Sequence, residues 1–354
     1  MENKARNLSI IIPTCNRGKN LNQLFDSITE LNIEKSFIEI LLIDNASTDN
    51  TKQICFEFID KNQEIDIRYF YEPVPGLLSG RHLGASEAKS EILCFLDDDV
   101  ELNPDWANSI LQILSERQDI DLLTGPNLPK YEIEPPRWLN DFWLPTPYGG
   151  KQCGELSLLD LGEQIIEIDA IWVWGLNFII RKNAYQELRG FHPDVIPQKI
   201  QFLQGDGETG LSIKANEAGM KSLYHYKVLL YHLVPDFRLT AEYFEKRYFY
   251  QGIADSYTAL RYQNGLYINH QTACKKSISF FKKSKRFIKK NYQKLIKLKT
   301  KEIENNEITQ LRNLFQQKYS EGYAYHQHHF NTNPLVREWV LKPDYMDYKL
   351  PEIK

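Results

Sequence analysis

The first third of the chain alternates short apolar runs with segments of helical length. The apolar runs are "LSIIIP", "IEILLID", "IDIRYFY" and "ILCFLD". The segments that follow them read as helices over Leu21–Leu31, Asn50–Asp60, Leu78–Lys89 and Asn103–Glu116. Strands that alternate with helices of about 10 to 15 residues indicate parallel strands joined by right-handed crossovers. We therefore predict an α/β fold with a mainly parallel central sheet flanked by helices.

Polar clusters accompany three of the four apolar runs. "PTCNR" closes the first run, "DNASTDNT" closes the second and "DDD" closes the fourth. Ligands of such sheets bind beyond the carboxyl ends of the strands. Because all three clusters fall at those ends, we expect them to meet at one crevice.

The acidic triad Asp97, Asp98 and Asp99 is the most informative cluster. Because side chains alternate along a strand, Asp97 and Asp99 are expected to point one way and Asp98 the other. Neighbouring carboxylates repel unless a cation lies beside them, and Mg²⁺ or Mn²⁺ commonly combines protein carboxylates with substrate phosphates. The triad thus predicts a metal site. The alternative is a solvated acidic turn that caps the helix near Pro104.

Asp44 and Arg81 extend the candidate site. Ser47 and Asp49 are explained as caps of the next helix, whereas Asp44 ends a buried strand without such an explanation. Arg81 stands near the start of the third predicted helix, and its guanidinium is well suited to a diphosphate. The alternative for Arg81 is a surface salt bridge.

Five stretches of the sequence resemble the family 2 glycosyltransferases, which have the GT-A fold. In the family's order they read "SIIIPTCNR", "LLIDNASTDNT", "GLLSGRHLGASEAKSEILCFLDDDV", "WGLNFIIRKNAYQELRGF" and "GDGETGLSIKANEAG". The resemblance implies transfer of a sugar, with inversion, from a nucleotide diphosphate sugar, usually a UDP-sugar. It also implies a divalent cofactor, Mn²⁺ or Mg²⁺. The implied acceptor is a glycan, a lipid-linked molecule or a small molecule.

The resemblance also implies roles for individual residues. Those expected around the nucleotide and its diphosphate are Pro13, Thr14, Asn16, Arg17, Asp44, Asn45, Arg81, Asp97 and Asp98. The implied metal ligands are Asp97, Asp99 and His232.

The acceptor side and the catalytic base complete this assignment. The resemblance places Gly175 and Asn177 in the acceptor-side loop, and Trp174 offers a flat apolar surface to a sugar or lipid. Glu208 falls at the position of the catalytic base. Asp206 stands just before it in the same glycine-rich motif, so both carboxylates stay candidates.

The alternating pattern ends near Pro235, and the rest of the chain reads as helical. We therefore predict a GT-A domain over residues 1–235 and a helical C-terminal extension over residues 236–354. Within the extension, Lys275–Lys301 holds twelve basic residues and no acidic one. This segment predicts a basic amphipathic helix on an anionic membrane surface. The alternative is a helix that packs its apolar stripe against the catalytic domain.

Composition limits the remaining function classes. The formal net charge is −4, but outside the basic segment 31 basic residues oppose 47 acidic ones, which argues against nucleic-acid binding. Without an apolar run of about 20 residues or a signal peptide, we expect a cytoplasmic location, peripheral on the inner membrane face at most. A catalytically inactive sugar-nucleotide-binding protein and a metal-dependent nucleotidyltransferase remain the alternatives. The sequence does not indicate the oligomeric state.

Overall fold

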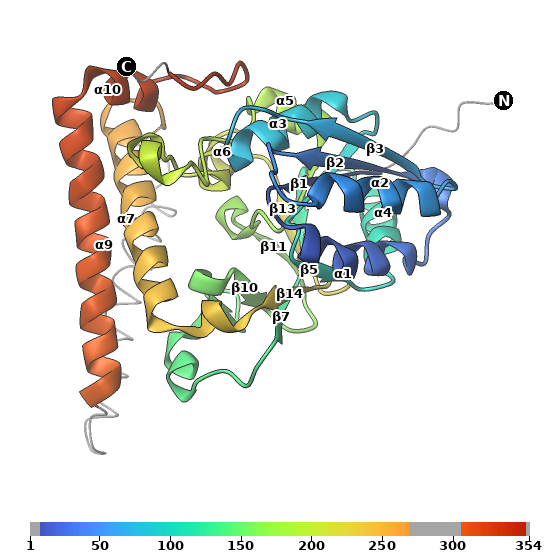
Figure 1. Cartoon of the computed structure of the whole chain (residues 1–354), viewed down its shortest axis with the longest axis horizontal. Helices are drawn as coiled ribbons and strands as arrows, with labels where there is room; N and C mark the ends of the chain where they lie inside the picture. Colours follow the sequence, from blue (N-terminus) through green and yellow to red (C-terminus); the bar gives the residue numbers. More distant parts are fainter. Residues whose placement is uncertain (1–7, 269–305, 352–354) are drawn as a thin grey trace.

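The computed structural model describes residues 8–268 and 306–351. Two β-sheets and a group of C-terminal helices make up this part of the chain (Figure 1). The basic segment Lys275–Lys301, for which we predict a membrane-facing helix, lies outside the described residues. None of the described helices is both long and apolar enough to cross a membrane.

The larger sheet has eight strands in the order β11-β13-β6-β12-β4-β1-β2-β3. Strands β1 to β4 pair in parallel, as predicted, whereas β12 runs antiparallel to both β4 and β6. The sheet is therefore mixed at one side and parallel where the polar clusters lie. The strands are β1 (Leu8–Thr14), β2 (Ile38–Asp44), β3 (Asp66–Tyr71), β4 (Ile92–Leu96), β6 (Leu122–Thr124), β11 (Ile165–Ile168), β12 (Asn177–Arg181) and β13 (Ser222–His225).

Helices cover both faces of this sheet, so β1 and β2 are buried along their whole length. Because successive side chains point to opposite faces, Ile10 and Ile12 join one hydrophobic cluster and Ile11 joins the other. The first cluster includes residues of α1 (Gly18–Thr29), α2 (Thr51–Lys61) and α4 (Trp106–Glu116). The second includes residues of α3 (Leu77–Glu87), α5 (Lys182–Glu187) and α6 (Glu208–Glu217).

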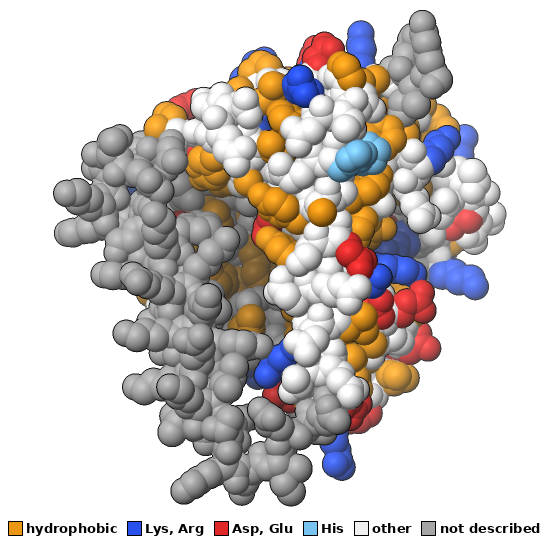
Figure 2. All heavy atoms as spheres, turned by 90° about the vertical axis from the view of Figure 1, so that its left-hand side faces the viewer, with side chains coloured by type: hydrophobic (Ala, Val, Ile, Leu, Met, Phe, Trp, Pro, Cys, Tyr) orange, Lys and Arg blue, Asp and Glu red, His pale blue; other side chains and the backbone are white. Residues whose placement is uncertain are grey.

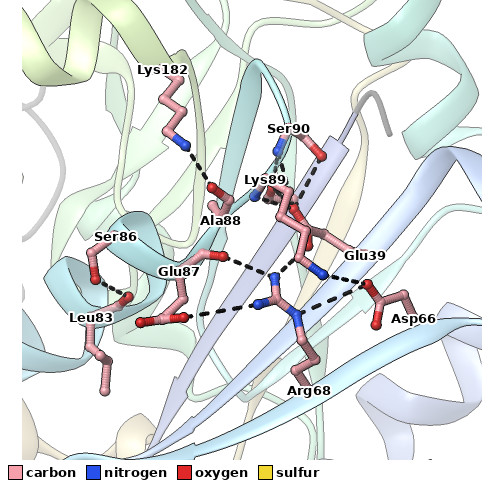
Figure 3. A network of polar contacts seen from close by, with 11 residues as sticks. Glu39, Asp66, Arg68, Leu83, Ser86, Glu87, Ala88, Lys89, Ser90 and Lys182 are labelled. Atoms are coloured by element: carbon pink, nitrogen blue, oxygen red, sulfur yellow. Dashed lines mark hydrogen bonds and ion pairs between the residues drawn. The ribbon is translucent and has the colours of Figure 1, made fainter. Parts of the chain in front are cut away.

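A buried glutamate ties the strands together at the amino end of this sheet (Figure 3). Glu39 of β2 is fully buried and accepts hydrogen bonds from the Ser9 hydroxyl and from the backbone N–H groups of Lys89 and Ser90. Arg68 of β3 forms an ion pair with its other carboxylate oxygen. Burial opposes the charge, but these partners outweigh it and lower the pKa of Glu39. The network thus joins β1, β2, β3 and the start of β4.

A second sheet lies beside the first and was not predicted. It has six strands in the order β5-β14-β7-β10-β9-β8. Much of it comes from the proline-rich segment 127–160, where the sequence shows no clear alternation. The strands are β5 (Val100–Leu102), β7 (Asn127–Tyr131), β8 (Leu144–Pro145), β9 (Lys151–Cys153), β10 (Leu158–Asp160) and β14 (Leu230–Val234).

The C-terminal helices α7 (Ala241–Gln263), α9 (Asn306–Thr332) and α10 (Pro334–Val340) follow the second sheet. Helices α7 and α9 lie side by side (Figure 1) because two glycines allow close contact: a Cβ on Gly252 would lie 2.1 Å from the Tyr319 carbonyl oxygen. A Cβ on Gly322 would lie 2.0 Å from the Phe249 carbonyl oxygen. On the face that α9 presents, the described surface mixes acidic, basic and hydrophobic side chains (Figure 2).

Candidate active site

A cavity of about 520 Å³ lies at the carboxyl ends of β1 and β4. It brings together residues from all three predicted polar clusters and from the second sheet, as the pattern of strand ends predicts. On the nucleotide side, the predicted residues that line it are Pro13, Thr14, Arg17 and Asn45. The predicted acidic and metal-binding residues that line it are Asp97, Asp98, Asp99 and His232.

The acidic triad is a turn rather than the end of a strand. Strand β4 ends at Leu96 and β5 begins at Val100, so the alternation of side chains along a strand does not apply to the three residues between them. The expectation that Asp98 points away from Asp97 and Asp99 is therefore wrong, since all three line the cavity. Asp98 faces β1, and its carboxylate accepts a hydrogen bond of 2.7 Å from the Thr14 hydroxyl.

Cationic side chains and a proton offset the repulsion within the triad. Arg238 Nη2 lies 2.5 Å from Asp99 Oδ2, and His232 Nε2 lies 3.4 Å from Asp99 Oδ1. Burial opposes the charge of Asp99, but the guanidinium groups of Arg238 and Arg17 act against burial, and the pKa of Asp99 is lowered. Burial and the charge of Asp99 raise the pKa of Asp98 to about 7. At neutral pH Asp98 is therefore partly protonated.

Arg81 joins the triad to the region of the predicted base. Its buried guanidinium lies 3.3 Å from Asp97 and 3.5 Å from Glu208, over the ring of Phe191. A Cβ on Gly175 would lie 2.4 Å from Arg81 Nη2, so the absence of a side chain at Gly175 makes room for this arginine. The surface salt bridge considered for Arg81 does not apply, because only 3% of its side chain is exposed.

The two candidate bases have different surroundings. Glu208 begins α6, keeps 26% of its side chain exposed and accepts a hydrogen bond from the backbone N–H of Gly175 at 3.2 Å. Asp206 is almost fully buried. Its carboxylate oxygens lie 2.8 Å from His192 Nδ1 and from the hydroxyls of Thr258 and Tyr267. Asp206 thus joins the sheet domain to the C-terminal helices, while Glu208 keeps an accessible carboxylate.

Comparison with known proteins places the first part of this site in a family. Residues 9–158 match the profile of the family described as glycosyl transferase family 2. This part of the chain belongs to glycosyl transferase family 2. The predicted family is confirmed.

Two curated relatives are glycosyltransferases. Glycosyltransferase AglE from Haloferax volcanii is 29% identical over 118 residues, which cover 33% of this chain and 38% of AglE. Validoxylamine A glucosyltransferase from Streptomyces hygroscopicus is 24% identical over 211 residues, 53% of this chain and 47% of that protein. The chain thus spans less than half of the length of either relative.

One solved structure supports the fold. The mannosyltransferase PcManGT from Pyrobaculum calidifontis, determined in complex with GDP-Man and Mn²⁺, superposes with a TM-score of 0.53 at 16% sequence identity. The match covers 73% of this chain and 66% of PcManGT. At this identity the likeness concerns the fold alone, and the predicted GT-A architecture is confirmed.

Several residues that the resemblance assigns to the glycosyltransferase site are held in other contacts. Asn16 is exposed, and its side-chain oxygen accepts hydrogen bonds from the backbone N–H groups of Thr48 and Asp49. Asp44 is buried and accepts from the Tyr69 hydroxyl at 2.7 Å and from the Ser47 N–H at 2.9 Å. These contacts fix the loops behind β1 and β2, and neither side chain lines the cavity.

The acceptor-side residues also have structural contacts. Asn177 is buried in β12, where it accepts a hydrogen bond from the Trp106 indole N–H and donates one to the Val228 carbonyl. Trp174 stacks on Trp172 with 6.2 Å between ring centroids and stays partly exposed. Of the three predicted acceptor-side residues, Gly175 is the one that contacts Glu208.

Three residues in or near the candidate site were not singled out from the sequence. Arg238 and Arg247 line the cavity from the start of the C-terminal extension. Asp194 lies close to Glu208: burial raises the pKa of Asp194, and the charge of Glu208 adds to that effect. A signal for the arginines was present, since both follow His232 within one short stretch, "DFRLTAEYFEKR".

The surroundings of Asp206 predict a role in stability. Asp206→Asn is expected to lower the free energy of unfolding by roughly 3 kcal/mol at pH 7, because a buried charge that holds three partners is lost. Burial raises the pKa of Asp206, but His192 and the hydrogen bonds to the carboxylate outweigh burial and leave that pKa lowered. Its stabilising contribution is therefore present at neutral pH and declines as the pH falls below about 4.

Urea denaturation of both proteins at a series of pH values measures this effect. The difference in unfolding free energy is expected to narrow from pH 7 to about pH 3. Equal stability of the two proteins at pH 7 would contradict the structural role of Asp206.

Proposed function

We propose that the protein transfers a sugar from a nucleotide diphosphate sugar, a UDP-sugar in the first instance, to an acceptor hydroxyl with inversion. The observation that carries the proposal is the shared cavity of the acidic triad, Thr14 and Arg17, with Arg81 linking the triad to Glu208. A volume of about 520 Å³ is in the range of small-molecule and cofactor sites. Family membership of residues 9–158 supports the reaction type.

Glu208 is the general base of the proposed reaction. Inverting transfer requires a side chain that takes the proton from the acceptor hydroxyl as this hydroxyl attacks the anomeric carbon. The Gly175 N–H and Arg81 hold the Glu208 carboxylate from one side and leave part of it accessible. Arg17, in the wall of the same cavity, supplies positive charge for the diphosphate leaving group.

Asp99 and His232 fit a divalent cation. His232 Nδ1 donates to the Leu156 carbonyl at 2.8 Å, which leaves Nε2 as an acceptor 3.4 Å from Asp99 Oδ1. No three His, Cys, Asp or Glu side chains gather into a metal site within residues 8–268 and 306–351, so the diphosphate would supply further ligands. When bound, Mn²⁺ or Mg²⁺ would neutralise charge that develops on the departing diphosphate.

A donor panel tests this function. Purified full-length protein is incubated with UDP-, GDP- and dTDP-sugars, with and without Mn²⁺, and donor hydrolysis and the shift in Tm are measured. We expect metal-dependent release of UDP from a UDP-sugar, together with a stabilisation of about 2.7 kcal/mol at a donor concentration 100 times its Kd.

The same panel separates the alternatives. A catalytically inactive binding protein would show the stabilisation without hydrolysis. With a nucleoside triphosphate and a sugar phosphate added to the panel, a nucleotidyltransferase would release pyrophosphate. Absence of both stabilisation and hydrolysis with every donor would contradict the proposed function.

A further inference from the structure

One arginine lies between the two side chains that fit the metal. Arg238 Nη2 lies 2.5 Å from Asp99 Oδ2, and Arg238 Nη1 lies 2.7 Å from His232 Nε2. Its guanidinium therefore bridges the carboxylate and the imidazole with two adjacent nitrogens. Arg238 belongs to the short 3-10 helix η6 (Asp236–Leu239), which connects β14 to α7.

The lone pairs that face Arg238 are those that a divalent cation would use. The Leu156 carbonyl accepts from His232 Nδ1, so Nε2 is an acceptor and receives its hydrogen bond from the guanidinium. Asp99 is held in place independently, since its backbone carbonyl accepts from the Leu233 N–H at 2.8 Å. The two ligands are thus fixed by the backbone of other elements, and a cationic side chain satisfies them both.

Arg238 itself is satisfied incompletely. The side chain is only 10% exposed, and its Nε is buried without a hydrogen-bond partner among the described residues. The rings of Phe237 and Tyr243 lie 5.9 Å from its guanidinium carbon. A buried donor without a partner is unfavourable, because the hydrogen bond to water that it lost is not replaced. This cost reduces the free energy needed to move Arg238 out of its position.

We propose that Arg238 competes with the divalent cation for Asp99 and His232, so that the metal binds only when the guanidinium has moved away. The inference deepens the proposed function, because it concerns the metal ligands of the same site. A ligand that needs a less populated conformation binds with an apparent Kd raised in inverse proportion to that population. Arg238 therefore weakens metal binding and couples it to a movement of η6, directly before α7.

Mn²⁺ binding without nucleotide tests the competition. Free Mn²⁺ is measured by room-temperature EPR in titrations of the full-length protein, its Arg238→Met variant and its Arg247→Met variant. Arg247 lines the same cavity, whereas the guanidinium groups paired with Asp99 among the described residues are those of Arg17 and Arg238. Both substitutions thus remove one positive charge from the cavity, but only Arg238→Met frees the two ligands.

We expect Arg238→Met to lower the Kd for Mn²⁺ by about tenfold relative to the unmodified protein, and Arg247→Met to change it much less. In pulsed EPR, Mn²⁺ bound to Arg238→Met is expected to show coupling to an imidazole nitrogen, and this coupling should disappear in a double variant with His232→Gln. Equal affinities of the two arginine variants, or weaker binding by Arg238→Met, would overturn the proposal.

A second substitution, Arg238→Lys, keeps the proposal testable if Arg238→Met does not fold. Arg238→Lys keeps the charge but cannot bridge two acceptors with a planar fork, so we expect an intermediate Mn²⁺ affinity. If Arg238→Met does not fold, a Kd of Arg238→Lys equal to that of the unmodified protein would overturn the competition. Donor hydrolysis by the unmodified protein is measured separately. Failure of hydrolysis would therefore count against the proposed function and not against the competition for the metal ligands.

Discussion

Glu208→Gln is expected to lower kcat for sugar transfer by at least about 10²-fold, the usual cost of losing a general base. Glutamine preserves the shape of the side chain and can still accept a hydrogen bond from the Gly175 N–H, but it cannot take a proton from the acceptor. Donor affinity should change little, because Arg81 lies between Glu208 and the acidic triad. Turnover with saturating donor and acceptor, together with donor binding by calorimetry, measures both effects.

Asp206→Asn serves as the comparison for Glu208→Gln. Both variants replace a carboxylate by an amide in the same glycine-rich motif, but Asp206 is enclosed by His192, Thr258 and Tyr267. At a temperature where both variants are folded, we expect Asp206→Asn to keep most of its turnover. Retained turnover in Glu208→Gln with loss in Asp206→Asn would move the base to Asp206. Retention in both variants would exclude both residues as the base.

Asp99→Asn is expected to abolish Mn²⁺-dependent donor binding and to reduce turnover by roughly 10³-fold, about 4 kcal/mol of transition-state stabilisation. The substitution removes the carboxylate that faces His232 and leaves the buried guanidinium of Arg238 without its counter-charge. A lower Tm is therefore expected as well. Donor titrations with and without Mn²⁺, in proteins shown to be folded by circular dichroism, measure the effect on binding.

Asp98→Asn is the matched control for Asp99→Asn. Asp98 lines the same cavity, but burial and the charge of Asp99 raise the pKa of Asp98 to about 7. The amide therefore resembles a protonation state that Asp98 already populates at neutral pH, and the hydroxyl of Thr14 can still donate to it. We expect a much smaller loss of metal-dependent binding. Losses as large as those of Asp99→Asn would contradict this division of roles within the triad.

The sequence predicted the parallel half of the main sheet because β1, β2 and β4 are covered on both faces and read as continuous apolar runs. It predicted the meeting of Thr14 with the triad for the same reason, since strand ends in such a sheet share one edge. It did not predict the second sheet. The strands in segment 127–160 are two to five residues long, which is too short to show a clear alternation, and two of them contain a proline. The segment joins the rest of the sheet through the pairing of β7 with the distant β14.

The details of the site depend on contacts that no local pattern encodes. The alternation argument failed for Asp98 because the chain turns directly after Leu96, one residue before the triad begins. Arg238 is 139 residues away from Asp99, and its position follows from the pairing of β14 with β5 and β7. The contrast between Asp206 and Glu208 likewise depends on Thr258, within α7, and on Tyr267, beyond its end.

The buried Glu39 helps to hold the register between β1 and β4. Its carboxylate accepts hydrogen bonds from Ser9 of β1 and from Ser90, just before β4. At the other end of the same two strands, the Thr14 hydroxyl donates to Asp98. A slip of one residue between these strands would shift Asp98 by about 3.3 Å, farther than its 2.7 Å hydrogen bond from Thr14 spans. The hydrogen bonds of Glu39 thus support the same register of β1 and β4 that brings Thr14 to Asp98 at the opposite end of these strands.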